Sequence, residues 1–137
     1  MKLKACLDTG VITQFYSKDV PEKIKNFKNQ IKTRTIDACT LFPLVAEATF
    51  HICKLEGKDA ALQKISNFLN TYPIRIILLD SGTSIKAGLL RCQHRRMLSY
   101  NDCLAIAFCL NNKYTLHTTE KKLKDLIPNL SLTTYFF

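Results

Sequence analysis

Glycine and proline are scarce in this sequence, with four of each among 137 residues, and this scarcity argues against a turn-rich all-β sandwich. No apolar run approaches about 18 residues, so we expect neither a membrane-spanning helix nor a membrane partner. Asp8 and Gly10 interrupt the apolar N-terminal segment, which therefore lacks the long core of a secretory signal peptide. No repeat, low-complexity tract or linker is visible. We expect a single domain over residues 1–137.

The cysteines show no C-x-x-C pair and no Cys/His spacing typical of a zinc site. Most of them lie inside apolar runs, where a free thiol behaves as a small hydrophobic residue. We therefore interpret them as reduced core residues of a cytoplasmic protein. They are Cys6, Cys39, Cys53, Cys92, Cys103 and Cys109.

Positive charge is in excess, because 20 Lys and Arg against 11 Asp and Glu give a formal net charge of +9. Hydrophobic residues make up 47% and charged residues 23%, as in ordinary globular proteins. The charge points to a polyanionic partner and leaves the fold open.

Short apolar runs that predict strands alternate with segments of helical periodicity. The strand segments are residues 3–7, 35–39, 74–79, 114–118 and 130–137. The helical segments lie around residues 11–16, 24–31, 41–55, 58–71, 83–96, 100–111 and 123–126, with Thr40 as the expected N-cap of the third. This order predicts a three-layer α/β domain with a mainly parallel sheet of about four to five strands.

Carboxylates occur where a parallel sheet would gather them, since its ligand crevice lies beyond the carboxyl ends of the strands. Asp8, Asp80 and Glu120 follow predicted strands, although Asp80 is also interpreted as a helix cap and Asp37 as a strand-edge residue. Collecting several unpaired carboxylates at one sheet end would cost several kcal/mol unless a cation neutralised them. Oxygen ligands of this kind suit Mg²⁺ or Mn²⁺.

Two segments in the first half of the chain place an acid in an apolar setting. An apolar strand ends in Asp8 and Thr9 and leads into a helix (CLDTGVITQFY). Glu47 is a lone acid at the edge of the apolar stripe of the helix TLFPLVAEATF. The other side of that helix is also apolar, which predicts deep burial or a subunit interface. That second strip consists of Phe42, Ala46, Phe50 and Cys53.

Two further segments complete the pattern. SYNDCLAIAFCLNN places Asp102 in the first turn of an apolar helix, with Ser99 or Asn101 as its cap. A strand then runs into Thr118 and, two residues later, Glu120. In order, spacing and length, the four segments resemble the PIN-domain nucleases along essentially the whole chain. The third is similar to the Ser-x-x-Asp motif of that family and the fourth to its Thr-x-Asp motif. The chain looks most like the VapC-like ribonuclease toxins of toxin–antitoxin pairs.

The resemblance implies a PIN-like α/β/α fold and hydrolysis of RNA phosphodiester bonds with Mg²⁺ or Mn²⁺. Asp8, Glu47 and Asp102 would bind the ion, and Glu120 would support it or hold a second one. Side-chain hydroxyl groups would hydrogen-bond these carboxylates and fix their rotamers. Those groups belong to Thr9, Ser99 and Thr118. The resemblance also implies a homodimer and inhibition by an antitoxin.

Two residues depart from the family pattern. Gly10 stands where the family often has Ser or Asn, so a hydroxyl or amide ligand near Asp8 is missing. Glu120 replaces the usual Asp, and its carboxylate reaches one methylene further. It would bind the ion directly, through a water, or not at all.

Basic residues near the predicted site are candidates for phosphate contacts, which position RNA without reading its sequence. Lys121 and Lys122 directly follow Glu120, and Arg95 and Arg96 precede the Asp102 segment. His51 and His117 are interpreted as structural histidines rather than metal ligands.

Other functions remain as alternatives. A receiver-type phosphoacceptor would need an adjacent acidic pair after the first strand, and a haloacid-dehalogenase-like phosphatase would need Asp-x-Asp, where this chain has Gly10. A PIN nuclease of RNA processing is compatible with the same motifs. A catalytically degenerate PIN fold that binds RNA or acts as a scaffold is compatible with the two departures.

Overall fold

The computed structural model describes residues 2–136, in which five parallel strands form one sheet of order β3-β2-β1-β4-β5. The strands are β1 (Leu3–Leu7), β2 (Ile36–Leu41), β3 (Ile74–Ile77), β4 (Thr115–Thr118) and β5 (Leu132–Thr134). The helices are α1 (Thr9–Gln14), α2 (Glu22–Lys32), α3 (Phe42–Glu56), α4 (Lys58–Thr71), α5 (Ser81–Gln93), α6 (Tyr100–Asn112) and α7 (Leu123–Leu126).

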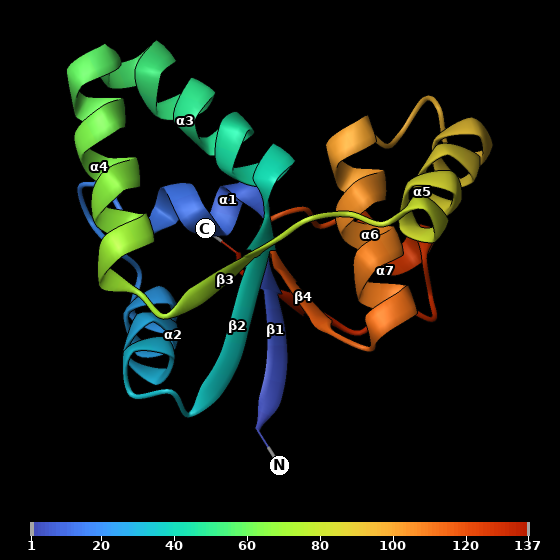
Figure 1. Cartoon of the computed structure of the whole chain (residues 1–137), viewed down its shortest axis with the longest axis horizontal. Helices are drawn as coiled ribbons and strands as arrows, with labels where there is room; N and C mark the ends of the chain where they lie inside the picture. The colour runs from blue at the N-terminus through green and yellow to red at the C-terminus, as the bar shows by residue number, and fades with distance from the viewer. Residues whose placement is uncertain (1, 137) are drawn as a thin grey trace.

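The helices cover both faces of the sheet, with α1 to α4 on one side and α5 to α7 on the other (Figure 1). Connections between parallel strands are right-handed, so a reversal in strand order moves the connecting helices to the opposite face. The chain proceeds outward from β1 to β3 and then returns to β4 and β5, where that reversal occurs. The predicted three-layer α/β architecture with a parallel sheet is confirmed.

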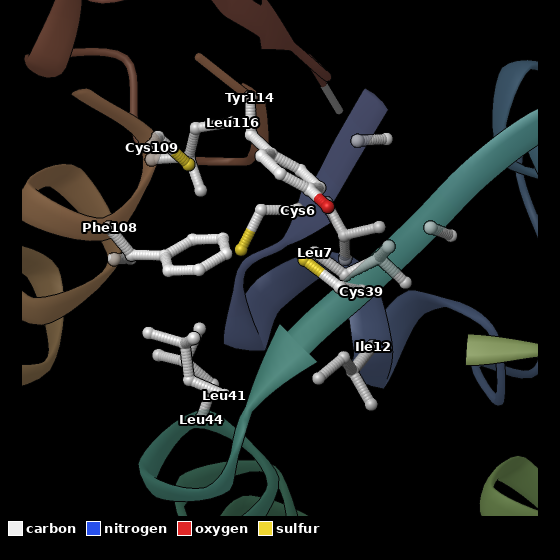
Figure 2. Close-up of a cluster of buried hydrophobic side chains, with 14 of the residues drawn as sticks. Cys6, Leu7, Ile12, Cys39, Leu41, Leu44, Phe108, Cys109, Tyr114 and Leu116 are labelled. Atoms are coloured by element: carbon white, nitrogen blue, oxygen red, sulfur yellow. The ribbon is translucent and has the colours of Figure 1, made fainter. Parts of the chain in front are cut away.

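The core is built on the central strand β1, whose last three residues are buried. Figure 2 shows Leu7, Leu41 and Leu44 with Phe108 and Leu116, side chains from strands and from helices on both sides. Burying a large apolar side chain of this kind stabilises a fold by about 1.5–3 kcal/mol.

All six cysteines are free thiols, but only four of them lie in the core. Cys53 and Cys92 are exposed, so the prediction that they are core residues was wrong. They lie on α3 and α5, where the outward face of each helix carries apolar side chains as well.

The structure shifts several element boundaries. Thr40 is not an N-cap: β2 continues to Leu41, which pairs with Ile77 of β3, and the Thr40 hydroxyl donates to the Leu7 carbonyl at 2.7 Å. β3 ends at Ile77 rather than residue 79. Helix α5 spans residues 81–93 rather than 83–96, because Asp80 caps it by accepting from the Thr83 amide at 2.7 Å. The final strand is shorter than residues 130–137, and residue 137 lies outside the described residues.

The second apolar strip of α3 is exposed, not deeply buried. Phe42 is 52% and Phe50 60% exposed, and Leu55 near the end of the helix is 79% exposed. The reason is visible in Figure 1, where α3 and α4 form a pair whose connecting corner extends away from the sheet. Gly57 makes that corner with a φ of +96°, a conformation that favours glycine, and so ends α3 where predicted.

None of the helices in residues 2–136 combines the length and the apolar character that crossing a membrane requires.

Candidate active site

A pocket of about 210 Å³ opens where β1 and β4 end, between α1, α3 and α6. All four acids predicted from the sequence line this one pocket, although they are far apart along the chain. Its lining residues are Asp8, Thr9, Gly10, Thr13, Glu47, His51, Asp102, Thr119 and Glu120.

Asp8 is the most buried acid of the pocket, with 5% of its surface exposed. It caps α1: its Oδ1 accepts from the Thr9 amide at 2.9 Å, and its Oδ2 accepts from the Thr118 hydroxyl at 2.7 Å. Burial raises the pKa of Asp8 to about 6; the hydrogen bonds from Thr118 and Thr9 oppose the shift, and the charges of Asp102 and Glu47 add to it. Asp8 is therefore a carboxylate largely shielded from water, in a pocket that it shares with other carboxylates.

Glu47 reaches the pocket from α3 and is held from α6. The Asn101 side-chain amide donates to Glu47 Oε1 at 2.6 Å and to the Pro43 carbonyl at 3.2 Å. On the other side, His51 Nε2 lies 3.3 Å from Glu47 Oε2, one helical turn away. The sequence predicts Asn101 only as a possible cap, because no local pattern in it signals a contact between these two helices.

Asp102 takes part in the N-terminal cap of α6 and also lines the pocket. Ser99 is the N-cap, and its hydroxyl accepts from the Asp102 amide at 3.1 Å while Asp102 Oδ2 accepts from the Ser99 amide at 3.0 Å. This reciprocal arrangement is a capping box. Ser99 thus orients the carboxylate through its backbone N–H, whereas a hydroxyl contact was expected.

Glu120 follows β4 and is linked to Asp8 through one side chain. Its amide donates to the Thr118 hydroxyl oxygen at 3.0 Å, and that hydroxyl in turn donates to Asp8. Lys122 Nζ lies 4.0 Å from Glu120 Oε2, at the rim of the pocket. Thr118 therefore contacts the Asp8 carboxylate, as the sequence predicts, but contacts Glu120 only through its backbone amide.

The donors in the pocket have the chemistry that a hard divalent cation requires, since they are carboxylates joined by threonine hydroxyls. Among residues 2–136, no group of three His, Cys, Asp or Glu side chains is placed to hold a metal ion. Asp8 and Asp102 are held by backbone N–H groups, and Glu47 is held by the Asn101 side chain. The residues fit a divalent cation by the chemistry of their donors, which are all oxygen ligands.

The remaining predicted residues lie around the pocket or away from it. Lys121 is exposed, with its Nζ 5.4 Å from the centre of the Phe136 ring. Arg95 and Arg96 line a separate hollow over residues 93–97 and are not part of the acidic pocket. His51, interpreted from the sequence as a structural histidine, is partly exposed and contributes to the pocket wall. Thr13 and Thr119 also line the pocket, and the sequence does not predict them, because Thr13 belongs to no motif and Thr119 occupies the variable position of the Thr-x-Asp pattern.

Comparisons with known proteins agree with this architecture. The family model of the PIN domain matches residues 5–126. No curated protein matches the sequence significantly.

Solved structures with similar folds include VapBC2 from Rickettsia felis bound to a promoter DNA fragment, at 23% identity and a TM-score of 0.77, covering 96% of this chain and 98% of that one. DNA-bound VapBC from Salmonella typhimurium has 19% identity and a TM-score of 0.70 over the same shares of the two chains. VapC20 from Mycobacterium tuberculosis, a toxin that cleaves the sarcin–ricin loop, has 14% identity and a TM-score of 0.63, covering 82% of this chain and 86% of that one. With the family model spanning most of the sequence, the chain belongs to the PIN-domain family.

Proposed function

We propose that this protein is a metal-dependent endoribonuclease of the VapC type, which hydrolyses RNA phosphodiester bonds at the acidic pocket. The observation that carries the proposal is the convergence of Asp8, Glu47, Asp102 and Glu120 on one pocket at the carboxyl end of the sheet. Without a counter-ion the repulsion between these carboxylates destabilises the fold. A bound cation would neutralise them and make the pocket a metal site.

Mg²⁺ or Mn²⁺ bound there would polarise the phosphate and lower the pKa of an attacking water. The residues of this chain supply the holding framework. Asp8 is fixed by Thr9 and Thr118, Asp102 by the Ser99 amide, and Glu47 by the Asn101 side chain. Outer contacts of this kind typically change metal affinity or activity by about 10–100-fold when removed.

Basic side chains at the rim would hold the RNA backbone. Lys122 lies beside Glu120, and its neighbour Lys121 is exposed. Arg95 and Arg96 lie in their own exposed hollow and would contact phosphates further along the strand. Because these contacts are electrostatic, RNA binding should weaken as salt concentration rises.

The structural neighbours that are toxin–antitoxin complexes support an antitoxin partner for this chain as well. The exposed apolar strip of α3, with Phe42 and Phe50, is the surface we assign to a homodimer contact. A PIN nuclease of RNA processing would use the same pocket without an antitoxin.

Cleavage of total RNA by the purified chain, with Mn²⁺ or with EDTA, tests the proposal. We expect cleavage only with Mn²⁺ and its loss in Asp102→Asn. The matched control is Asp37→Asn, since Asp37 is an acid outside the pocket that pairs with Arg75. Cleavage that persists in EDTA or in Asp102→Asn would contradict the proposal. If the chain neither cleaved RNA nor gained thermal stability with Mn²⁺, the result would favour the catalytically degenerate scaffold. The departures at Gly10 and Glu120 are compatible with that alternative.

A further inference from the structure

Gly10 and Thr119 share a wall of the acidic pocket. A Cβ atom built on Gly10 would overlap the Thr119 hydroxyl oxygen and would lie 3.2 Å from both the Cβ and the Cγ2 atoms of Thr119. Thr119 therefore occupies the volume that a side chain at position 10 would need. A side chain at position 10 would therefore require the Thr119 side chain to move.

The two adjacent threonines use their hydroxyl groups differently. Thr118 donates to Asp8 and accepts from the Glu120 amide, so its hydroxyl is committed to the framework of the site. The Thr119 hydroxyl makes no side-chain hydrogen bond within residues 2–136, although Thr119 lines the pocket. That hydroxyl is available to a ligand.

We propose that the Thr119 hydroxyl supplies the neutral oxygen ligand of the divalent-cation site, in the place where a side chain at position 10 would otherwise supply it. This inference rests on the proposed function, because it assigns a further ligand to the same pocket. A hydroxyl is a hard oxygen donor, and it adds a ligand without adding negative charge to carboxylates that already repel one another. The loss of a polar side chain at Gly10 is thereby offset from another segment of the chain.

Mn²⁺ titration of the purified chain without RNA, followed by calorimetry, tests the inference. Thr119→Val keeps the shape and removes the hydroxyl, and we expect it to weaken Mn²⁺ binding by about 10-fold. Thr119→Ser keeps the hydroxyl and should bind as the unchanged chain does. Thermal unfolding without metal verifies that each variant folds.

An exchange of the two side chains provides a rescue. Gly10→Ser alone should lower the melting temperature, because the new side chain meets Thr119. Thr119→Ala removes the hydroxyl that a Cβ at position 10 would overlap and leaves only the Cβ contact at 3.2 Å, so the double variant with Gly10→Ser should bind Mn²⁺ more tightly than Thr119→Ala alone.

Unchanged Mn²⁺ affinity in Thr119→Val would overturn the inference and leave Thr119 as a residue that only fills space. Failure of Gly10→Ser to improve binding in the Thr119→Ala background would contradict the exchange. If the unchanged chain bound no Mn²⁺, both the proposed function and the inference would fail. If it bound Mn²⁺ and Thr119→Val bound it equally well, only the inference would fail.

Discussion

Asp8 and His117 lie at the ends of neighbouring strands, joined by a hydrogen bond of 2.9 Å from the Asp8 amide to the His117 carbonyl. Both side chains are buried, and both can carry a charge. His117 stacks on Phe27 at 4.2 Å between ring centres and hydrogen-bonds the Tyr135 hydroxyl at 2.9 Å, and burial lowers its pKa to about 4. Burial instead raises the pKa of Asp8 to about 6, in a pocket that holds further carboxylates.

The difference shows what each region is built for. Around His117 the fold keeps a neutral ring and gives it an aromatic face and a hydroxyl partner, so no charge is buried there at neutral pH. Around Asp8 the fold keeps a carboxylate among like charges and leaves the pocket open to solvent. Burial serves packing in the first case and prepares a ligand site in the second.

The largest expected effect is a difference in RNA cleavage between a variant at Asp8 and a variant at His117. Asp8→Asn should reduce Mn²⁺-dependent RNA cleavage by at least about 100-fold, since even the outer contacts of a metal site account for about 10–100-fold. His117→Gln should retain cleavage within a few-fold, because the His117 side chain packs away from the pocket. Initial cleavage rates of both variants at pH 7.5 provide the measurement. Comparable losses in the two variants would mean that His117 belongs to the site.

The second effect concerns acid stability and His117. The unfolded chain binds a proton at a pKa of 6.5 and the folded chain at about 4, so stability is fully present above pH 6.5 and falls as pH drops toward 4. The size of this contribution is about 3 kcal/mol. His117→Gln should be less stable at pH 7 but should lack this dependence. Urea unfolding of the metal-free proteins between pH 4 and 7.5 measures the free energy of unfolding at each pH. An identical pH profile in the variant would refute the assignment of this dependence to His117.

Much of the fold follows from local sequence signals. The strand over residues 3–7 and the helix over 58–71 have the predicted bounds, because an apolar run ending at Asp8 marks the first and helical periodicity between Gly57 and Pro73 marks the second. The short helix that carries Leu123 and Leu126 was also predicted. The helix over 41–55 was predicted, but the sequence left open whether its second strip is deeply buried or belongs to a subunit interface, and the structure excludes deep burial. An apolar strip has the same pattern whether it is buried or lies on a surface.

The candidate site could be predicted only in part. Strand ends and apolar helices identified the four acids, and the parallel sheet brought them to one pocket. The contacts that orient them were missed: Asn101 holds Glu47 across 54 positions of sequence, and Thr119 meets Gly10 from the other end of the chain. Such pairs depend on how α3, α6 and β4 are placed in space, and no local pattern encodes that.

The smallest expected effect concerns Asp8 in the metal-free protein, and it has the opposite sign to that of His117. The folded pKa of about 6 lies above the ordinary value of 3.8, so the folded state binds more protons between these values and stability falls as pH rises through them. The penalty at neutral pH is at most about 3 kcal/mol, and Asp8→Asn should relieve it. The variant should therefore gain stability relative to the unchanged chain as pH rises from 4 to 7.5.

Because the two slopes oppose each other, the metal-free chain should show little net change in stability between pH 4 and 6 from these two groups. Removing either group should then reveal the other. Asp8→Asn should become steeply more stable with rising pH, through His117 alone, and His117→Gln should become less stable, through Asp8 alone. Mn²⁺ at pH 7.5 should stabilise the unchanged chain and His117→Gln but not Asp8→Asn. Equal stabilisation of all three by Mn²⁺ would mean that Asp8 is not where the ion binds, and that its burial serves packing as that of His117 does.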